Sequence, residues 1–241
     1  MRKTDLRALV MATAVLWIAM PALAGKPKSS VPAVRWAEET PGCTFARGDD
    51  GMYRWGLWTT ELGITIAVDS QELEKARKRI GGVFGVLVTV KYRGSGSVVA
   101  DMNNMGLEFV EHSHVTQTSI DPDGFAKRMQ ADADELEHQT GRTLKKHPEK
   151  KQEQEAAVQA YLKDSTEFQE FLSKNAFRET KLDSGNPTVA GWVFFSTRNK
   201  WIGDWKKRED FIFRMPLEKQ VFEFPFSLPP TQGDLILRKR P

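Results

Sequence analysis

Two histidines separated by one residue are the strongest candidates for chemistry in this sequence. His112 and His114 occur in the segment EHSHV, and Glu108 precedes them. On a β-strand, side chains two residues apart leave the same face, so both imidazole rings would point the same way. Two imidazoles can share a zinc or copper ion when further ligands arrive from elsewhere, for which His138 and Asp134 are the candidates. The alternative interpretation is a pair of solvent-facing polar residues.

No common enzyme motif accompanies the histidines. The sequence has no G-x-S-x-G elbow, no H-E-x-x-H, no phosphate-binding loop and no dinucleotide-binding glycine motif. Acidic residues crowd positions 132–137, but Lys127, Arg128 and Arg142 flank them, which is typical of a solvated helix face. A carboxylate pair for glycoside hydrolysis stays open, because its members need not be close in sequence. The sequence therefore favours a protein without catalytic activity.

Tryptophans in polar surroundings are the candidates for a contact surface. Trp201 and Trp205 lie in STRNKWIGDWKKRED, and Trp55 and Trp58 lie in MYRWGLW. Indole rings on loops stack on sugar rings or anchor a partner protein. The same rings can instead close over the end of a core. Binding through these four residues is one hypothesis, and packing is the other.

Short segments of alternating side chains before residue 118 predict β-strands. One face of GITIAVD is apolar, and VFGVLVTVKY has its apolar face at Phe84, Val86, Val88, Val90 and Tyr92. Between these strands, DSQELEKARKRIGG predicts a short helix, which Asp69 would cap while Glu72 completes a capping box. The segment LEFVEHSHV predicts a further strand, which would carry both histidines.

Two amphipathic helices are expected in the middle of the chain. Residues 121–140 begin with a cap at Asp121 and a proline at the first helical position, followed by an apolar stripe at Phe125, Met129, Ala133 and Leu136. Residues 148–177 repeat the pattern, with a stripe at Ala157, Tyr161, Phe168 and Leu172. A short polar linker joins them, so the sequence predicts a helical hairpin inserted at residues 121–175.

Strand-like alternation returns after the hairpin. Trp192 and Phe194 point to one side of VAGWVFFST, and Val193 and Phe195 point to the other. A strand that is apolar on both faces is expected where a second sheet covers one side and the hairpin covers the other. In VFEFPFSL, Pro225 suits an edge strand. The expected fold is mainly β, with a single antiparallel β-sandwich over residues 34–230 that the hairpin interrupts.

The order of these segments resembles the immunoglobulin-like β-sandwiches of exported bacterial proteins of unknown function. The resemblance rests on VTVKYRG after the short helix and on LDSGNPTVAGWVFF before the last strands. It covers roughly residues 60–228 apart from the helices. That group has no catalytic residues to carry over, so the resemblance implies only a fold and export.

The N-terminal segment predicts export. Three basic residues among the first seven precede an apolar run from Ala8 to Met20, the layout of a secretory signal peptide cleaved after Ala24. The alternative is an uncleaved anchor, but the run is shorter than the ~20 residues that span a bilayer. Residues 25–33 would form a flexible lead-in and residues 231–241 a basic tail. The mature chain is expected in the periplasm or outside the cell, without stable membrane insertion.

Charge and cysteine content narrow the remaining functions. Without residues 1–24 the chain keeps 32 of its 35 basic and 31 of its 32 acidic residues, and this balance argues against nucleic-acid binding. Cys43 is the only cysteine, so the fold cannot depend on an internal disulfide. The leading hypothesis is an exported, non-catalytic protein without a cofactor, which contacts an envelope component through the hairpin and the Trp201 and Trp205 loop. The alternatives are a metal-dependent enzyme or metal-binding protein using His112 and His114, and a carbohydrate-binding module.

Overall fold

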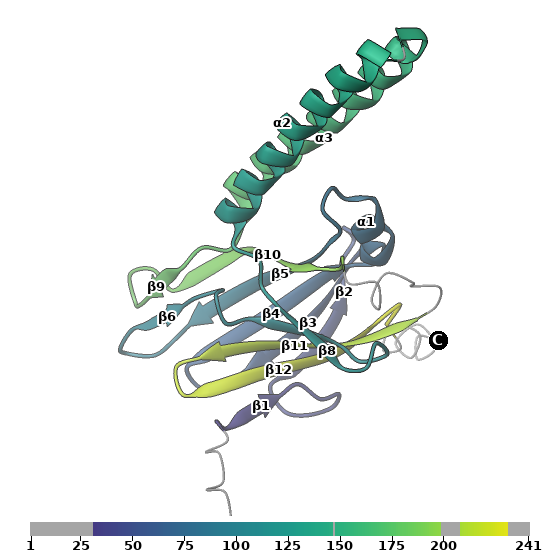
Figure 1. The fold of residues 1–241 in the computed structure, drawn as a ribbon. Helices are drawn as coiled ribbons and strands as arrows, with labels where there is room; N and C mark the ends of the chain where they lie inside the picture. Colours follow the sequence, from purple (N-terminus) through teal and green to yellow (C-terminus); the bar gives the residue numbers. More distant parts are fainter. Residues whose placement is uncertain (1–30, 147, 199–207, 231–241) are drawn as a thin grey trace, which may run out of the picture. The chain divides into compact units, whose positions relative to one another are not determined.

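A computed structural model describes residues 31–146, 148–198 and 208–230 of the chain. The expected signal peptide and basic tail lie outside these residues. These residues form two five-stranded sheets, a two-stranded ribbon and three α-helices, and the strands of the two sheets are interleaved along the chain (Figure 1). The elements are β1 Ala33–Arg35, β2 Cys43–Arg47, β3 Met52–Trp58, β4 Leu62–Asp69, α1 Glu72–Lys78, β5 Val83–Tyr92, β6 Val98–Ala100, β7 Gly106–Phe109, β8 Val115–Thr118, α2 Pro122–Lys146, the 3-10 turn Pro148–Lys150, α3 Lys151–Asn175, β9 Thr180–Leu182, β10 Thr188–Ser196, β11 Glu209–Leu217 and β12 Gln220–Leu228.

The fold is mainly β, and its strand pairs are antiparallel except for β1 and β12. One sheet has the order β1-β12-β11-β7-β8, and the other has the order β10-β5-β4-β3-β2. The strands β6 and β9 form the separate ribbon. Among the described residues, none of the helices combines the length and apolar character needed to cross a bilayer.

Aromatic rings from the two five-stranded sheets meet in one core. Trp55 of β3 lies 5.1 Å from Phe226 of β12, and Phe84 of β5 lies 5.0 Å from Phe211 of β11, measured between ring centroids. The apolar face that the sequence predicts for β5 is fully buried from Phe84 to Val90. Because strands from both sides of the helical insertion contribute to this core, the prediction of one shared interior is confirmed.

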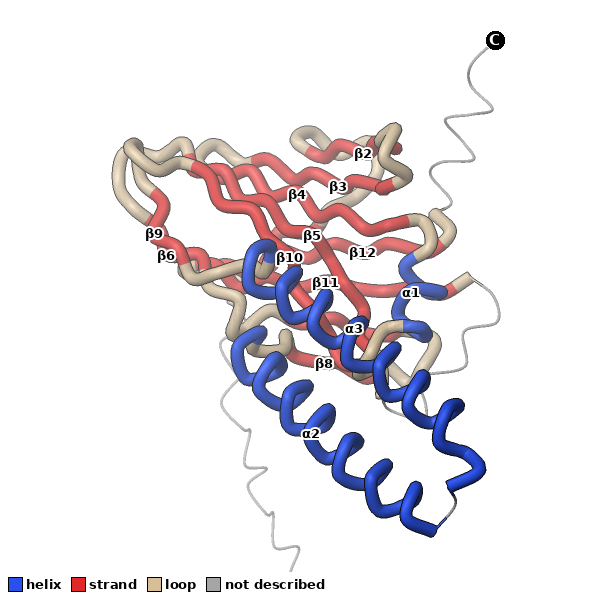
Figure 2. Tube along the Cα trace, turned by 90° about the horizontal axis from the view of Figure 1, so that it is seen from above, coloured by secondary structure: helices blue, strands red, loops and turns tan. Residues whose placement is uncertain are grey.

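The helical hairpin is attached to the free edge of β10. Ser119, just before α2, forms a β-bridge with Phe195, and Ala176, just after α3, forms one with Trp192. The backbone N–H of Phe177 donates to the carbonyl of Trp192 at 2.9 Å. Both ends of the insertion therefore continue the sheet by a residue or two, and Figure 2 shows the two helices side by side next to β10.

The two faces of β10 are buried as the sequence predicts. Val193 and Phe195 belong to the core between the sheets. Trp192 and Phe194 belong to a second apolar cluster, which they share with the first turns of α2 and the last turns of α3. Phe194 and Phe195 are thus interior residues and Trp192 is half-buried, as expected for a strand covered on both sides.

Three local predictions from the sequence are wrong: a helix cap, an edge strand and one position of a helix stripe. Asp69 does not cap α1; the helix starts after Gln71 without a side-chain cap, and Glu72 is buried instead. Pro225 does not lie on an edge strand, since β12 pairs with both β11 and β1. The pairing with β1 ends at Glu223, so the missing N–H of the proline removes no hydrogen bond between β12 and β1. In α3 the buried position is Val158 rather than Ala157, which is exposed.

Candidate functional site

Trp55 is not part of a contact surface. Its side chain is 0% exposed and packs against Phe45, Tyr53 and Phe226. In MYRWGLW the alternation places this ring inward, between the two sheets. The prediction that Trp55 offers a binding platform is therefore wrong, because the second sheet covers it.

Trp58 remains partly exposed at the end of β3, but its ring has neighbours already. It lies over Gly63 of the adjacent strand, where an added Cβ would approach ring atoms to 2.2 Å. The guanidinium carbon of Arg93 lies 4.7 Å from its ring centroid, a cation–π contact. Contact through Trp58 stays a prediction. Trp201 and Trp205 lie in residues 199–207, outside the described residues.

His112 and His114 do not lie on one strand. The segment that the sequence predicts as a continuous strand is broken after Phe109 by a turn, and the next strand starts at Val115. Ser113 and His114 have φ angles of 58° and 56°, which belong to a tight left-handed turn. The same-face argument for a shared metal ion therefore fails.

Each histidine is next to a different glutamate. Nδ1 of His114 lies 2.6 Å from Oε1 of Glu108, whereas Nε2 of His112 lies 3.3 Å from Oε2 of Glu209 without hydrogen-bond alignment. In the part of the chain that the structure describes, no three His, Cys, Asp or Glu side chains are grouped as metal ligands. The suggested further ligands, His138 and Asp134, are exposed on α2, where Asp134 accepts a hydrogen bond from Gln130.

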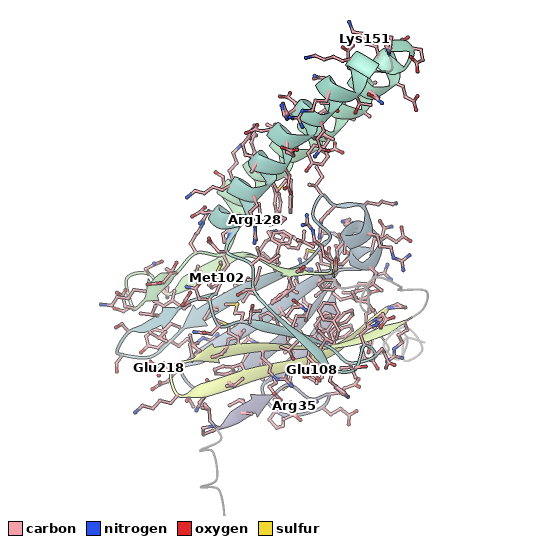
Figure 3. The ribbon with its side chains drawn as sticks, viewed as in Figure 1. Arg35, Met102, Glu108, Arg128, Lys151 and Glu218 are labelled. Carbon is pink, nitrogen blue, oxygen red and sulfur yellow. The ribbon has the colours of Figure 1, made fainter. Side chains whose placement is uncertain are left out.

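Glu108, which lies next to His114, is instead the end of a row of alternating charges. Glu108 pairs with Arg214, Arg214 donates to Glu223 at 2.8 Å, and Arg35 donates to Glu223 at 3.2 Å. These side chains come from the β7–β8 region, β11, β12 and β1, and Figure 3 labels Glu108 and Arg35 near its two ends. Opposite charges on neighbouring strands stabilise a sheet face. Sequence reasoning missed this row, because its members are up to 188 residues apart.

The two glutamates next to the histidines have opposite pKa shifts. Burial alone would raise the pKa of Glu108, but hydrogen bonds from His114 and Arg214 outweigh it and lower the pKa. Burial raises the pKa of Glu209 more than the neighbouring His112 lowers it. Each of the two carboxyls lies next to a side chain from another part of the chain, which is the character of a structural charge network.

The second cluster, at the base of the hairpin, is the densest aromatic site on the outside of the sheets. Phe168 of α3 lies 5.4 Å from Phe194, and Phe171 lies 5.9 Å from Trp192, in edge-to-face arrangements. Phe125 of α2 completes the group at 6.1 Å from Phe168. Aromatic pairs of this geometry contribute about 0.5–1.5 kcal/mol each beyond the burial of their area. These rings fix the lower turns of both helices on β10.

An ion pair with a buried carboxylate lies next to the same cluster. Glu72 is 0% exposed, accepts the backbone N–H of Gly85 at 2.6 Å and pairs with Arg79. The guanidinium of Arg79 also lies 5.6 Å from the ring centroid of Phe194. Burial raises the pKa of Glu72 despite the opposing effect of Arg79. The carboxylate joins α1 to β5, which explains why it does not serve as a helix cap.

A cavity of about 800 Å³ lies beside the base of the hairpin. Its wall includes the end of β8 from Gln117 to Ser119, Arg128 and Asp132 of α2, and Arg198 after β10. Two arginines and two acidic residues, Asp121 and Asp132, face it, so its charges balance. The balanced charges of this lining select no particular ligand.

Hydrogen bonds and ion pairs of the outer part of the hairpin lie within the hairpin. Among the described residues, Gln130 pairs with Asp134, Gln139 with Glu135 and Lys151 with Glu155. The seam between the helices follows Gln154, Val158, Tyr161, Ser165, Phe168 and Leu172, a spacing of four and three residues. Gln154 occupies the outermost of these positions and Ser165 a central one, so polar side chains interrupt the apolar seam.

Comparisons with other proteins add no assignment. No protein-family model matches the chain, and neither the curated proteins nor the solved structures include one that matches it.

Proposed function

We propose that this chain is an exported, non-catalytic protein with an immunoglobulin-like β-sandwich, which works by contact through its helical hairpin. The single observation that carries the proposal is the length of the hairpin beyond its attachment. Among the described residues, Asp132 is the last residue of α2 that lines the cavity beside the sheets, and Tyr161 of α3 interacts with Arg198 after β10. From residue 133 to Lys146, α2 continues for 14 residues, about 20 Å at a rise of 1.5 Å per residue.

Two further features support contact rather than packing as the role of these outer turns. Their surface is mainly exposed and charged, so they do not bury an apolar face of the sheets. Their attachment is rigid, since both ends of the insertion are bridged to β10 and the lower turns are fixed by aromatic rings. A polar two-helix element held firmly at one end is suited to presenting a surface to a partner.

The experiment compares photo-crosslinking from two exposed positions in living cells. A crosslinkable residue at Glu137, in the outer hairpin, is expected to capture a partner. A residue of the same kind at Lys219, exposed in the turn between β11 and β12, is the matched control and is expected to capture little. Equal capture from both positions, or capture from Lys219 alone, would contradict the proposal.

A shortened hairpin provides the complementary test. Replacing residues 134–159 by a short glycine-containing turn keeps the aromatic base, so the sheets are expected to stay folded. Tryptophan fluorescence and near-ultraviolet circular dichroism check the fold. Failure of the shortened protein to bind the partner captured from Glu137 would assign the contact to the outer hairpin.

A further inference from the structure

The charges of the hairpin are separated along its length. Residues 142–151, which form its tip, contain five basic residues and one acidic residue, a net charge of +4. The remaining parts of the two helices, residues 122–141 and 152–175, contain ten acidic and four basic residues, a net charge of −6. Figure 3 labels Lys151 at the tip and Arg128 near the base. We call residues 142–151 the basic tip and the two remaining parts the acidic stalk.

The position of the tip lysines is not explained by helix stability. Arg142, Lys145 and Lys146 end α2, where basic residues are favourable for the helix dipole. Lys151, however, is the first residue of α3, and Lys150 precedes it, so both place positive charge at the positive end of a helix dipole. Basic residues at this unfavourable position point to a role other than stabilising the helix. The side chain of Lys151 is 68% exposed, and its carboxylate partner Glu155 is 3.9 Å away.

We propose that the basic tip binds end-on to a surface of anionic phospholipid headgroups. Arg142, Lys145 and Lys151 are exposed at this end of the hairpin. Basic residues near an anionic membrane surface each add about 1 kcal/mol, or roughly five-fold in affinity. The acidic stalk is repelled by the same surface, so the hairpin meets it tip first, and a crosslinker at Glu137, five residues before the tip, lies within about 8 Å of it. This inference rests on the proposed contact function and names the partner of the same hairpin.

A lipid surface fits these charges better than a nucleic acid does. A duplex or a single strand would extend past the tip along the acidic stalk, where it would be repelled. Single-stranded nucleic acid is also bound by stacking on aromatic rings, and residues 142–151 contain no Phe, Tyr or Trp. A planar surface that meets the hairpin at its end avoids both problems.

The test measures binding of the exported form of the full protein to vesicles. One set contains phosphatidylcholine with an equal amount of phosphatidylglycerol, and the other contains phosphatidylcholine alone. Any binding through apolar residues 8–20, if they are retained, appears in both sets. We expect binding to the anionic vesicles only, and we expect it to weaken as salt is raised, because the screening length falls from about 30 Å at 0.01 M to about 10 Å at 0.1 M.

Two variants with equal changes in net charge separate the tip from the chain as a whole. The tip variant combines Lys145→Gln and Lys151→Gln, and its affinity for anionic vesicles is expected to fall about 25-fold. The stalk variant combines Lys163→Gln and Lys174→Gln. These lysines are 75% and 70% exposed and each has a glutamate four residues away, as Lys151 has. The stalk variant is expected to bind as the unchanged protein does.

Three outcomes would overturn the lipid proposal. They are equal losses in the two variants, equal binding to both kinds of vesicle, and binding to double-stranded DNA without binding to anionic vesicles. If the vesicles fail while crosslinks from Glu137 persist, the contact function stands with a different partner. If the crosslinks fail as well, the contact function itself is wrong.

Discussion

Replacing Gly191 by alanine tests how the second helix of the hairpin is attached to the sheet. Gly191 lies on β10, and a Cβ built there would be 2.4 Å from Cα of Phe177 and 2.5 Å from its backbone nitrogen. Carbon atoms pack best at about 3.5–4.0 Å, so the chain after α3 would have to move away by roughly 1 Å. Both close atoms belong to the backbone, so no change of rotamer relieves the overlap.

The cost of this movement follows from two contributions. Overpacking of an interior typically costs about 1–3 kcal/mol. The hydrogen bond from the N–H of Phe177 to the carbonyl of Trp192, now 2.9 Å, would be stretched, which costs about 1 kcal/mol more. The higher strand preference of alanine offsets about 0.5–1 kcal/mol. The free energy of unfolding is therefore expected to fall by about 1–3.5 kcal/mol.

Urea unfolding followed by tryptophan fluorescence measures this loss, and hydrogen exchange of the Phe177 amide measures it locally. The matched control is Gly141→Ala, since Gly141 lies in α2 with no atom within 4 Å of an added Cβ. This control is expected to raise the free energy of unfolding by up to about 1 kcal/mol. Stability in Gly191→Ala equal to that of the unchanged protein, with normal protection of Phe177, would refute the reasoning.

Three other substitutions test the remaining parts of the structure. Phe194→Ala removes the ring at the centre of the hairpin base and is expected to lower the free energy of unfolding by about 3–4 kcal/mol, measured by urea unfolding, whereas an effect below 1 kcal/mol would mean that the base is not packed. Glu72→Ala leaves Arg79 and the N–H of Gly85 without their buried partner and is expected to cost about 3 kcal/mol; wild-type stability would contradict the ion pair. Glu108→Gln tests pH dependence. Because the folded-state pKa of Glu108 is lowered, its contribution to stability is present above the unfolded pKa of about 4.3 and is lost as pH falls through the folded value. The variant should therefore lose less stability between pH 5 and 3 than the unchanged protein does. Parallel pH profiles of stability for the two proteins would refute this.

Sequence patterns were sufficient where a single element determines the side-chain environment. The alternation in β5 predicts its buried face from Phe84 to Val90, and the double-sided apolar character of β10 predicts cover on both faces. The helical hairpin follows from the period of its apolar residues, although α2 runs to Lys146 rather than ending near residue 140. Basic residues at a helix end leave no periodic signal that marks the boundary.

The candidate site could not be read in this way. His112 and His114 fit a strand by alternation, but the turn between β7 and β8 separates their rings and gives each its own glutamate. The sequence around Trp55 does not show whether its ring faces the core or the solvent. Only its contact with Phe226, far along the chain, shows that the ring is buried. The charge row from Glu108 to Arg35 depends on the order in which the strands pair, which residue spacing does not encode.

The sequence by itself determined the spacing of apolar residues in the helices and strands, the apolar faces that had to be covered, and the charges of the basic tip and the acidic stalk of the hairpin. These properties depend on neighbouring residues, and helix and strand geometry convert them directly into faces. Only the tertiary structure decided what covers each face, how Gly191 admits the backbone after α3, and which charges meet on the outer face of the sheet. Those outcomes depend on contacts between residues far apart in the chain, because burial and ion pairing are set by whichever segments pack together.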